Sequence, residues 1–319
     1  MRARPLTVLT AMAAVTLVMA GCDEAIVEAK VSSKPMYSAP GRRAQPTQLG
    51  EPLPDGVTML GPPQAVPGSG FDGLQARIQQ ATDEAAASGA ALSVAILDRK
   101  THQLVSNGNT QIVGTASVAK LFIADDLLLA ESEGKAILSP EDRQALDVML
   151  QSSDDGAAEK FWDQGGGDAI ITQVASRYGL SSTTPPDDGR WWNTMSSIID
   201  LIHYYDVLLN GSGGLPAERA KIIVNDLAQS TPNGIDGYPQ RFGIPDGLYA
   251  EKVAVKQGWM CCIGSAWMHL STGVIGADRR YAMVVQSLQT SDDVTARETI
   301  TRAVKTIFPH GRIGSTLTD

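Results

Sequence analysis

The order of two hydrophobic patterns along residues 71–319 most constrains the fold. Apolar, β-branched runs open this segment at 91–98 and 103–105, and similar runs close it at 253–260, 266–270 and 281–288. Between them, apolar residues recur at helical spacing and predict helices at 117–130, 140–151, 157–164, 168–178, 194–209 and 216–229. Strands first, helices next and strands last favour an α+β domain with one antiparallel sheet. Both ends of the segment would feed that sheet, with the helical region inserted between them.

Residues that are typical of helix ends and turns refine this prediction. Leu74, Ile78 and Ala81 fit a first helix, and a last helix is predicted over 292–307. Ser139 followed by Pro140 predicts a helix start with serine as N-cap. Turns are predicted at 100–102, 271–273 and 277–280.

The first residues read as an export signal. Arg2 and Arg4 precede an uncharged apolar run over 6–20, which is shorter than the ~20 residues that a bilayer core requires. The quartet 19–22 (Met-Ala-Gly-Cys) resembles the bacterial lipobox, in which the signal peptide is cut before a cysteine that carries lipid. The resemblance implies a signal peptide over 1–21 and a lipid on Cys22, and hence attachment to the outer face of the plasma membrane. The alternative is a secretory signal with a coincidental cysteine.

Charge argues against two other kinds of partner. Removing residues 1–21 takes two cations and no acid, which moves the formal net charge from −9 to −11. An acidic chain of this kind argues against nucleic acid as a partner and against electrostatic adhesion to anionic headgroups. Residues 22–66 carry repeated prolines and no apolar period, so we expect an extended tether before a folded domain over 67–319.

Cysteine usage is sparse beyond the predicted lipid anchor. Cys261 and Cys262 are adjacent, and adjacent cysteines form only a strained disulfide ring. We expect two separate small hydrophobic side chains, although the exported compartment would permit a disulfide. No metal-ligand spacing and no cofactor motif is found in the sequence.

The first candidate for chemistry is the pair Ser117 and Lys120, three residues apart at the start of an apolar helix. A serine hydroxyl becomes a nucleophile when a base takes its proton, and a lysine of depressed pKa can be that base. The alternative is that Ser117 caps the helix while Lys120 extends to solvent. A second pair with the same spacing, Ser132 and Lys135, contains Gly134 and is interpreted as a turn.

Two further motifs support the catalytic interpretation. Ser153-Asp154-Asp155 follows the helix predicted at 140–151, and Lys256-Gln257-Gly258 lies on the first strand after the helical region. With Ser117 and Lys120, they resemble the S-x-x-K, S-D-N and K-T-G motifs of the serine β-lactamase and penicillin-binding protein superfamily. The strings at 116–131, 151–162, 253–262, 269–276 and 279–285 also look close to actinobacterial serine-hydrolase-like lipoproteins.

The resemblance implies a β-lactamase-like fold over residues 71–308 and a set of roles. Ser117 would be the nucleophile, Lys120 its general base, and Ser153 a proton relay to the leaving nitrogen. Lys256 would help to hold a substrate carboxylate. Asp155, Gln257, Gly258 and Trp259 would line the substrate and oxyanion region, with backbone N–H groups of Ser117 and Trp259 as the oxyanion hole. The implied reaction is acyl transfer from β-lactams or peptidoglycan stem peptides.

Three departures from the family motifs weaken the expectation of activity. Asp155 replaces asparagine, and its carboxylate should raise the pKa of Lys120 and repel a substrate carboxylate. Gln257 replaces threonine. The loop 180–193 lacks the glutamate that class A β-lactamases use in deacylation, and Asp187 and Asp188 there are either a substitute base or solvated turn residues. The alternative to a slow hydrolase is therefore a non-catalytic lipoprotein that binds a wall peptide or a partner. A third hypothesis makes the helical middle a protein interaction surface.

Overall fold

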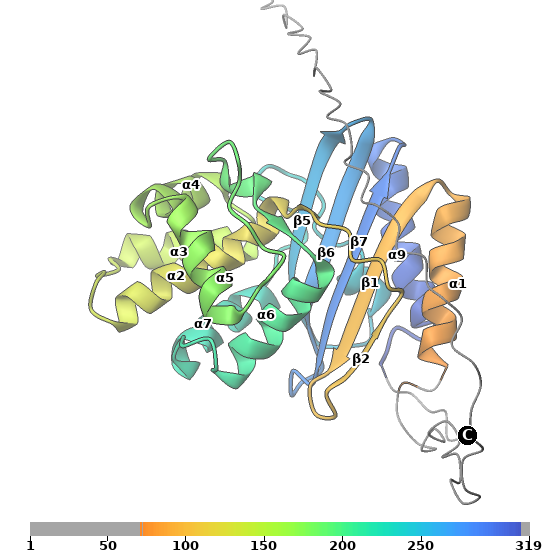
Figure 1. Cartoon of the computed structure of the whole chain (residues 1–319), viewed down its shortest axis with the longest axis horizontal. Helices are drawn as coiled ribbons and strands as arrows, with labels where there is room; N and C mark the ends of the chain where they lie inside the picture. Colours follow the sequence, from red (N-terminus) through yellow and green to blue (C-terminus); the bar gives the residue numbers. More distant parts are fainter. Residues whose placement is uncertain (1–70, 72, 314–319) are drawn as a thin grey trace, which may run out of the picture. The chain divides into compact units, whose positions relative to one another are not determined.

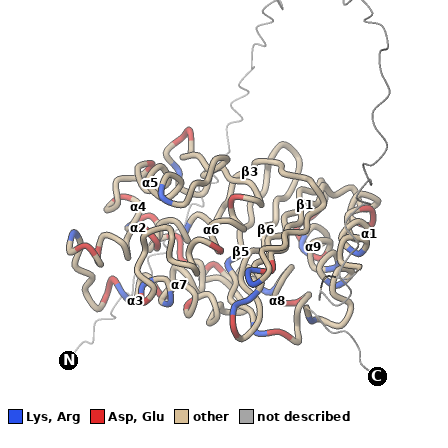
Figure 2. Tube along the Cα trace, turned by 60° about the horizontal axis from the view of Figure 1, so that its bottom comes forward, with Lys and Arg blue, Asp and Glu red and all other residues tan. Residues whose placement is uncertain are grey.

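The computed structural model describes residue 71 and residues 73–313 (Figure 1). The predicted signal peptide, Cys22 and the predicted tether over 22–66 lie outside the described residues. Along the part of the chain that is described, lysines and arginines are interspersed with acidic residues (Figure 2). No helix within that part is both long and apolar enough to cross a membrane.

A five-stranded antiparallel sheet forms the centre of the fold, as the sequence predicted. Its order is β2-β1-β7-β6-β5, so strands from the two ends of the domain lie side by side. The long pairing of β1 with β7 runs from Ala90 opposite Gln289 to Asp98 opposite Tyr281. The strands are β1 Ala90–Asp98, β2 Gln103–Ser106, β5 Val253–Ile263, β6 Ala266–Ile275 and β7 Tyr281–Gln289.

Each face of the sheet is covered by its own set of helices (Figure 1). One face packs against α1 Leu74–Ala87, α8 Ile244–Gly247 and α9 Asp293–Ile307. The other face packs against the helical region. Alternation along β1 explains both cores, because Val94 and Ile96 belong to the first and Ala95 and Leu97 to the second.

The helical region lies between β2 and β5 in the chain and confirms the predicted insertion. The helix α2, which begins at Lys120, is preceded by a short 3₁₀ turn. Ser139 caps α3 as predicted, since its side chain accepts from the Asp142 N–H while its own N–H donates to Asp142. The elements are η1 Ala116–Ala119, α2 Lys120–Ser132, α3 Pro140–Gln151, α4 Asp155–Gln164, α5 Asp168–Tyr178, η2 Trp191–Asn193, α6 Ile198–Asn210 and α7 Ala217–Ala228.

One predicted helix start and one predicted turn are wrong. The helix predicted from 194 begins at Ile198, because β4 Met195–Ser196 pairs with β3 Val113–Gly114 and Ser197 is the N-cap. The turn predicted at 271–273 lies inside β6. Its small polar residues suit the interior of the sheet, since the Thr272 hydroxyl bonds to the Tyr205 hydroxyl at 2.8 Å. A side chain at Gly273 would meet the Ala254 carbonyl at 2.2 Å.

Candidate active site

Ser117 lies in η1, directly before α2. The preceding residue, Ala116, has φ 47°, a left-handed conformation that non-glycine residues adopt rarely. Strain of this kind is common where a functional side chain must be presented in a fixed direction. Ser117 is 8% exposed and lines a pocket, and its hydroxyl oxygen lies 3.0 Å from the Lys120 amino nitrogen.

Lys120 is fully buried, so the alternative in which it extends to solvent is wrong. Its Nζ donates to the Ser153 carbonyl at 2.6 Å and to Asp155 Oδ1 at 2.6 Å. Both partners only accept hydrogen bonds. A neutral Lys120 amine therefore has two hydrogens for these acceptors and one lone pair left for the Ser117 hydroxyl proton.

Ser153 connects Lys120 to the second predicted lysine. Its φ is 61°, so Ser153, like Ala116, is a non-glycine residue in a left-handed conformation. Its hydroxyl accepts from Lys256 Nζ at 2.7 Å and lies 3.3 Å from Lys120 Nζ. Four residues that the motifs singled out, from η1, α2, the turn before α4 and β5, are thus brought together in one hydrogen-bonded group.

Burial dominates the electrostatics of the two lysines. The pKa of Lys120 is lowered from its usual value, because desolvation outweighs the opposing attraction of Asp155. Asp155 raises the pKa of Lys120, as expected from the sequence, but burial, which the sequence did not reveal, has the larger effect in the opposite direction. The pKa of Lys256 is lowered well below its usual value, first by burial and then by the charge on Lys120.

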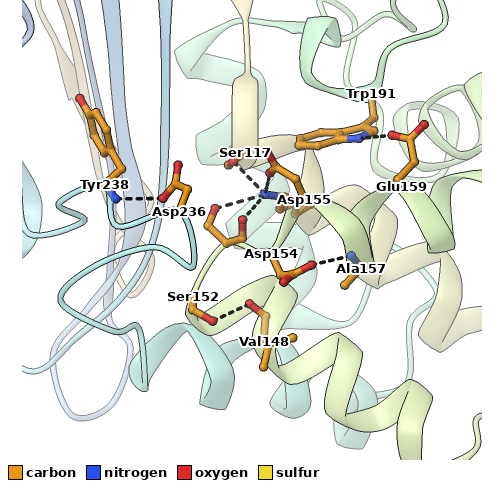
Figure 3. Close-up of polar contacts among 12 residues, drawn as sticks. Ser117, Val148, Ser152, Asp154, Asp155, Ala157, Glu159, Trp191, Asp236 and Tyr238 are labelled. Carbon is orange, nitrogen blue, oxygen red and sulfur yellow. Dashed lines mark hydrogen bonds and ion pairs between the residues drawn. The ribbon is translucent and has the colours of Figure 1, made fainter. Parts of the chain in front are cut away.

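The pocket in front of Ser117 has a volume of about 240 Å³. It combines aromatic and sulfur side chains with two carboxylates. Its lining residues are Ala116, Ser117, Asp155, Trp191, Trp192, Asp236, Trp259 and Met260. In Figure 3, Asp155 lies beside Ser117 under the Trp191 ring, and the Trp191 indole donates to Glu159 at 3.0 Å. The tryptophan pair therefore walls the pocket, with Trp191 buried and Trp192 partly exposed.

Asp236 was not singled out by the sequence. It is exposed and lines the pocket, and its Oδ1 accepts from the Tyr238 N–H at 2.9 Å (Figure 3). Tyr238 stacks on Trp259 with ring centroids 4.4 Å apart, and its hydroxyl bonds to His269 at 2.7 Å. An acidic residue in a Gly- and Pro-containing loop carries no pattern that separates it from a solvated turn.

Alternation along β5 separates the predicted site residues on that strand. Gln257 is fully buried and donates to the backbone carbonyls of Gln240 and Phe242 at 3.0 and 2.6 Å. It does not line the pocket, so the structure does not place it as a substrate contact. Gly258 lies against η1, where a side chain would meet the Thr115 carbonyl at 2.5 Å. Glycine is required here for the close approach of β5 to the serine.

Several other expectations are resolved within residues 73–313. Ser132 and Lys135 lie at the end of α2 beside Gly134 at φ 72°, which confirms a turn. Asp188 accepts from the Arg190 N–H and the Asn193 amide, as a turn residue does. Cys261 and Cys262 are separate free thiols, as expected, but both are exposed and so do not pack as small hydrophobic side chains. No group of three His, Cys, Asp or Glu residues in this part of the chain could hold a metal.

His269, on β6, belongs to a hydrogen-bonded network beside the pocket. His269 is fully buried, contacts Tyr238 and lies 3.3 Å from Asp293. Burial lowers its pKa to about 4, so it is neutral at physiological pH. It supports the loop that carries Asp236 through Tyr238.

Comparison with solved structures shows which known fold this protein resembles. No family model matches the chain. A β-lactamase from Chitinophaga pinensis superposes with a TM-score of 0.60 at 13% identity, covering 74% of this chain and 100% of that structure. A PBP-A variant, solved as an acyl-enzyme complex with penicillin G, gives 0.61 at 17% identity and covers 75% of this chain and 96% of the other. The fold is thus β-lactamase-like, as the motifs predicted.

Sequence comparison is more specific. The lipoproteins named LppW of Mycobacterium bovis and of Mycobacterium tuberculosis H37Rv are each 71% identical to the chain over 321 residues. The matches cover 98% of this chain and 100% of each relative. The chain therefore belongs to the LppW family of mycobacterial lipoproteins, on a β-lactamase-like fold.

Proposed function

We propose that this chain is a membrane-anchored serine hydrolase that forms an acyl-enzyme on Ser117, turns over slowly and acts at the cell wall. The observation that carries the proposal is the 3.0 Å contact between Ser117 Oγ and the amine of a fully buried Lys120. A lysine whose pKa is lowered by burial loses its proton more readily and can then hold a lone pair toward the serine.

The geometry supports a defined order of proton movements. Lys120 takes the Ser117 hydroxyl proton as Oγ attacks the substrate carbonyl, while the backbone N–H groups of Ser117 and Trp259 receive the developing oxyanion. The proton then passes from Lys120 to Ser153 Oγ, 3.3 Å away, and from Ser153 to the leaving nitrogen. Lys256, 2.7 Å from the same hydroxyl, keeps it oriented.

Hydrolysis of the acyl-enzyme would be the slow step. Asp187 and Asp188, the carboxylates of the loop 180–193, are exposed and do not line the pocket. The carboxylates that line it are Asp155, which is bonded to Lys120, and Asp236, whose Oδ1 accepts from a backbone N–H. Without a base dedicated to activating water, the acyl group is expected to persist on Ser117.

The mass of the intact protein tests the nucleophile. The full-length chain is incubated with a fluorophosphonate and, separately, with a penicillin, beside Ser117→Ala and Ser132→Ala. Ser132 is the matched control, because it has the same spacing to a lysine but lies at a helix end. We expect an adduct on the parent chain and on Ser132→Ala and no adduct on Ser117→Ala. Labelling that survives Ser117→Ala would contradict the proposal.

A second function is favoured by one observation. Asp155 occupies the position of the asparagine in the S-D-N motif of serine β-lactamases. Its carboxylate lies 2.6 Å from Lys120 and stabilises the protonated lysine. If neither probe labels the chain, the same pocket serves as a binding site for a wall component in a non-catalytic lipoprotein.

The anchoring half of the proposal assigns the lipid to Cys22 and the domain to the outer face of the plasma membrane. Metabolic labelling with a palmitate analogue and membrane fractionation test it. We expect Cys22→Ala to lose the label and to leave the membrane fraction, whereas a Cys261→Ala, Cys262→Ala double variant keeps both. Equal labelling of all three chains would place the lipid elsewhere.

A further inference from the structure

The pocket in front of Ser117 has the composition of a cage for an ammonium group. Three tryptophans, Trp191, Trp192 and Trp259, line it together with Met260. The remaining charged lining residues are Asp155 and Asp236, and no lysine or arginine lines it among the described residues. Aromatic faces combined with carboxylates attract cations, because the ring quadrupole and the negative charge act in the same direction.

Both carboxylates are available to a ligand. The Asp155 side chain is 75% exposed although one of its oxygens bonds to Lys120. Asp236 is exposed, and its Oδ1 accepts from a backbone N–H. In each residue the second oxygen has no hydrogen-bond partner among the described residues, which leaves its negative charge free to face a ligand cation.

One amino group of the chain already lies between a tryptophan ring and a carboxylate of this pocket. The Lys120 amino nitrogen lies 4.7 Å from the centroid of the Trp191 ring and 2.6 Å from Asp155. It is enclosed beneath the pocket by the same aromatic and acidic residues that face a ligand. A second amino group entering from solvent would meet Asp155 and the tryptophans from the open side.

A substrate carboxylate would meet the opposite conditions. The two lysines that could attract it, Lys120 and Lys256, are 0% and 1% exposed, and both already donate to protein oxygens. An entering carboxylate would therefore approach Asp155 and Asp236 before it reached either lysine. Repulsion between like charges in a confined pocket disfavours this approach.

From this composition we propose that the pocket binds ligands that carry an ammonium group more tightly than ligands that present a carboxylate to Asp155 and Asp236. One consequence of this inference rests on the proposed function. If Ser117 is acylated, the acyl donor is an amine-bearing peptide or ester. The same selectivity also predicts that a penicillin, which carries a carboxylate, acylates Ser117 more slowly than a neutral fluorophosphonate does.

Tryptophan fluorescence titration tests the selection without requiring chemistry. The full-length Ser117→Ala chain is titrated with benzyltrimethylammonium, benzyl alcohol and phenylacetate, which share a phenyl ring and differ in charge. We expect benzyltrimethylammonium to bind at least about tenfold more tightly than phenylacetate, with benzyl alcohol between them. Equal affinities for the three probes, or tighter binding of phenylacetate, would overturn the inference.

Variants locate the binding. Asp236→Asn should weaken benzyltrimethylammonium about fivefold or more and strengthen phenylacetate. Asp187→Asn is the matched control, because Asp187 is also an exposed aspartate but does not line the pocket, and it should change neither affinity beyond about twofold. If both variants lose binding equally, the cation is attracted by the acidic surface as a whole and the inference fails.

The outcomes separate this inference from the proposed function. Cation-selective binding without fluorophosphonate labelling of the parent chain would retain the cage and reject the hydrolase. Labelling at Ser117 without cation selectivity would retain the hydrolase and reject the cage.

Discussion

Lys256 donates to the Ser153 hydroxyl at 2.7 Å from a strand that lies 103 residues further along the chain. Ser153 Oγ is also within 3.3 Å of Lys120, so a single hydroxyl lies between two buried amines. Burial lowers the pKa of both lysines, and the charge on Lys120 lowers the pKa of Lys256 further. The arrangement therefore disfavours two ammonium groups on either side of the Ser153 hydroxyl.

Replacing Lys256 should slow acylation. Lys256→Met removes the amine that donates to the Ser153 hydroxyl and keeps it oriented beside Lys120. We expect fluorophosphonate labelling at pH 7 to fall about tenfold or more. The measurement is the labelling rate between pH 6 and pH 10, with circular dichroism to verify folding. A rate equal to that of the parent chain in a folded variant would contradict the role of Lys256 in orienting Ser153.

The same substitution should change how stability depends on pH. Because the folded-state pKa of Lys256 lies well below 10.5, the unfolded chain binds more protons between those two values. Stability then rises as pH increases through that window. Lys256→Met should flatten the rise measured by urea unfolding at pH 7 and pH 10. Lys135→Met, at a 71% exposed side chain, is the control and should leave the slope unchanged.

Asp155→Asn should accelerate acylation. The carboxylate raises the Lys120 pKa against the effect of burial, so its removal takes away the largest opposing contribution and lowers that pKa further. We expect labelling of Ser117 at pH 7 to increase about threefold to tenfold, with the pH profile moved to lower pH. An unchanged or lower rate would show that Asp155 orients Lys120 rather than restraining it.

Gly258→Ala should damage the site by separating β5 from η1. The added methyl would lie 2.5 Å from the Thr115 carbonyl, a contact with backbone that a rotamer change cannot relieve. We expect a loss of about 1–3 kcal/mol in the free energy of unfolding and a loss of labelling. Gly156→Ala in α4 is the control, because its nearest contact is 3.3 Å and alanine favours a helix. Equal stability of the two variants would contradict the close approach.

Asp125→Ala should be the most destabilising change in the helical region. Asp125 is fully buried and pairs with Arg177 at 2.5 Å, with the Tyr178 hydroxyl as a further partner. Removing one member of a buried ion pair leaves the other uncompensated, at a cost of about 3–5 kcal/mol. Asp126→Ala, one residue along and only partly buried, should cost less. Urea unfolding of the two variants measures the difference, and similar losses would contradict the role of the pair.

Much of the fold could be predicted because its signals are local. Helical and alternating periods placed the elements and their order, and serine and proline at 139 and 140 marked a helix start. The errors arose where tertiary contacts override local preference. Ser271, Thr272 and Gly273 suggest a turn in isolation, yet they are buried between neighbouring strands, where hydroxyls find partners and glycine admits a close backbone. Gln257 could have been assigned away from the pocket by strand alternation with Lys256 and Gly258.

The sequence by itself determined the order of elements and the four motif residues, because periodicity and motif spacing are properties of neighbouring residues. Gly134 in the sequence already marked Ser132 with Lys135 as a turn, but only the tertiary structure gave Ser117 with Lys120 the environment of a reactive pair. The difference is burial and partners, since Lys120 is enclosed by groups from α4 and the turn before it whereas Lys135 is exposed. Asp236 also entered the pocket only through folding, because its position depends on how the loop before α8 lies along the edge strand β5. Desolvation and charge–charge effects act through space, so the acid–base character of this site depends on the assembled fold.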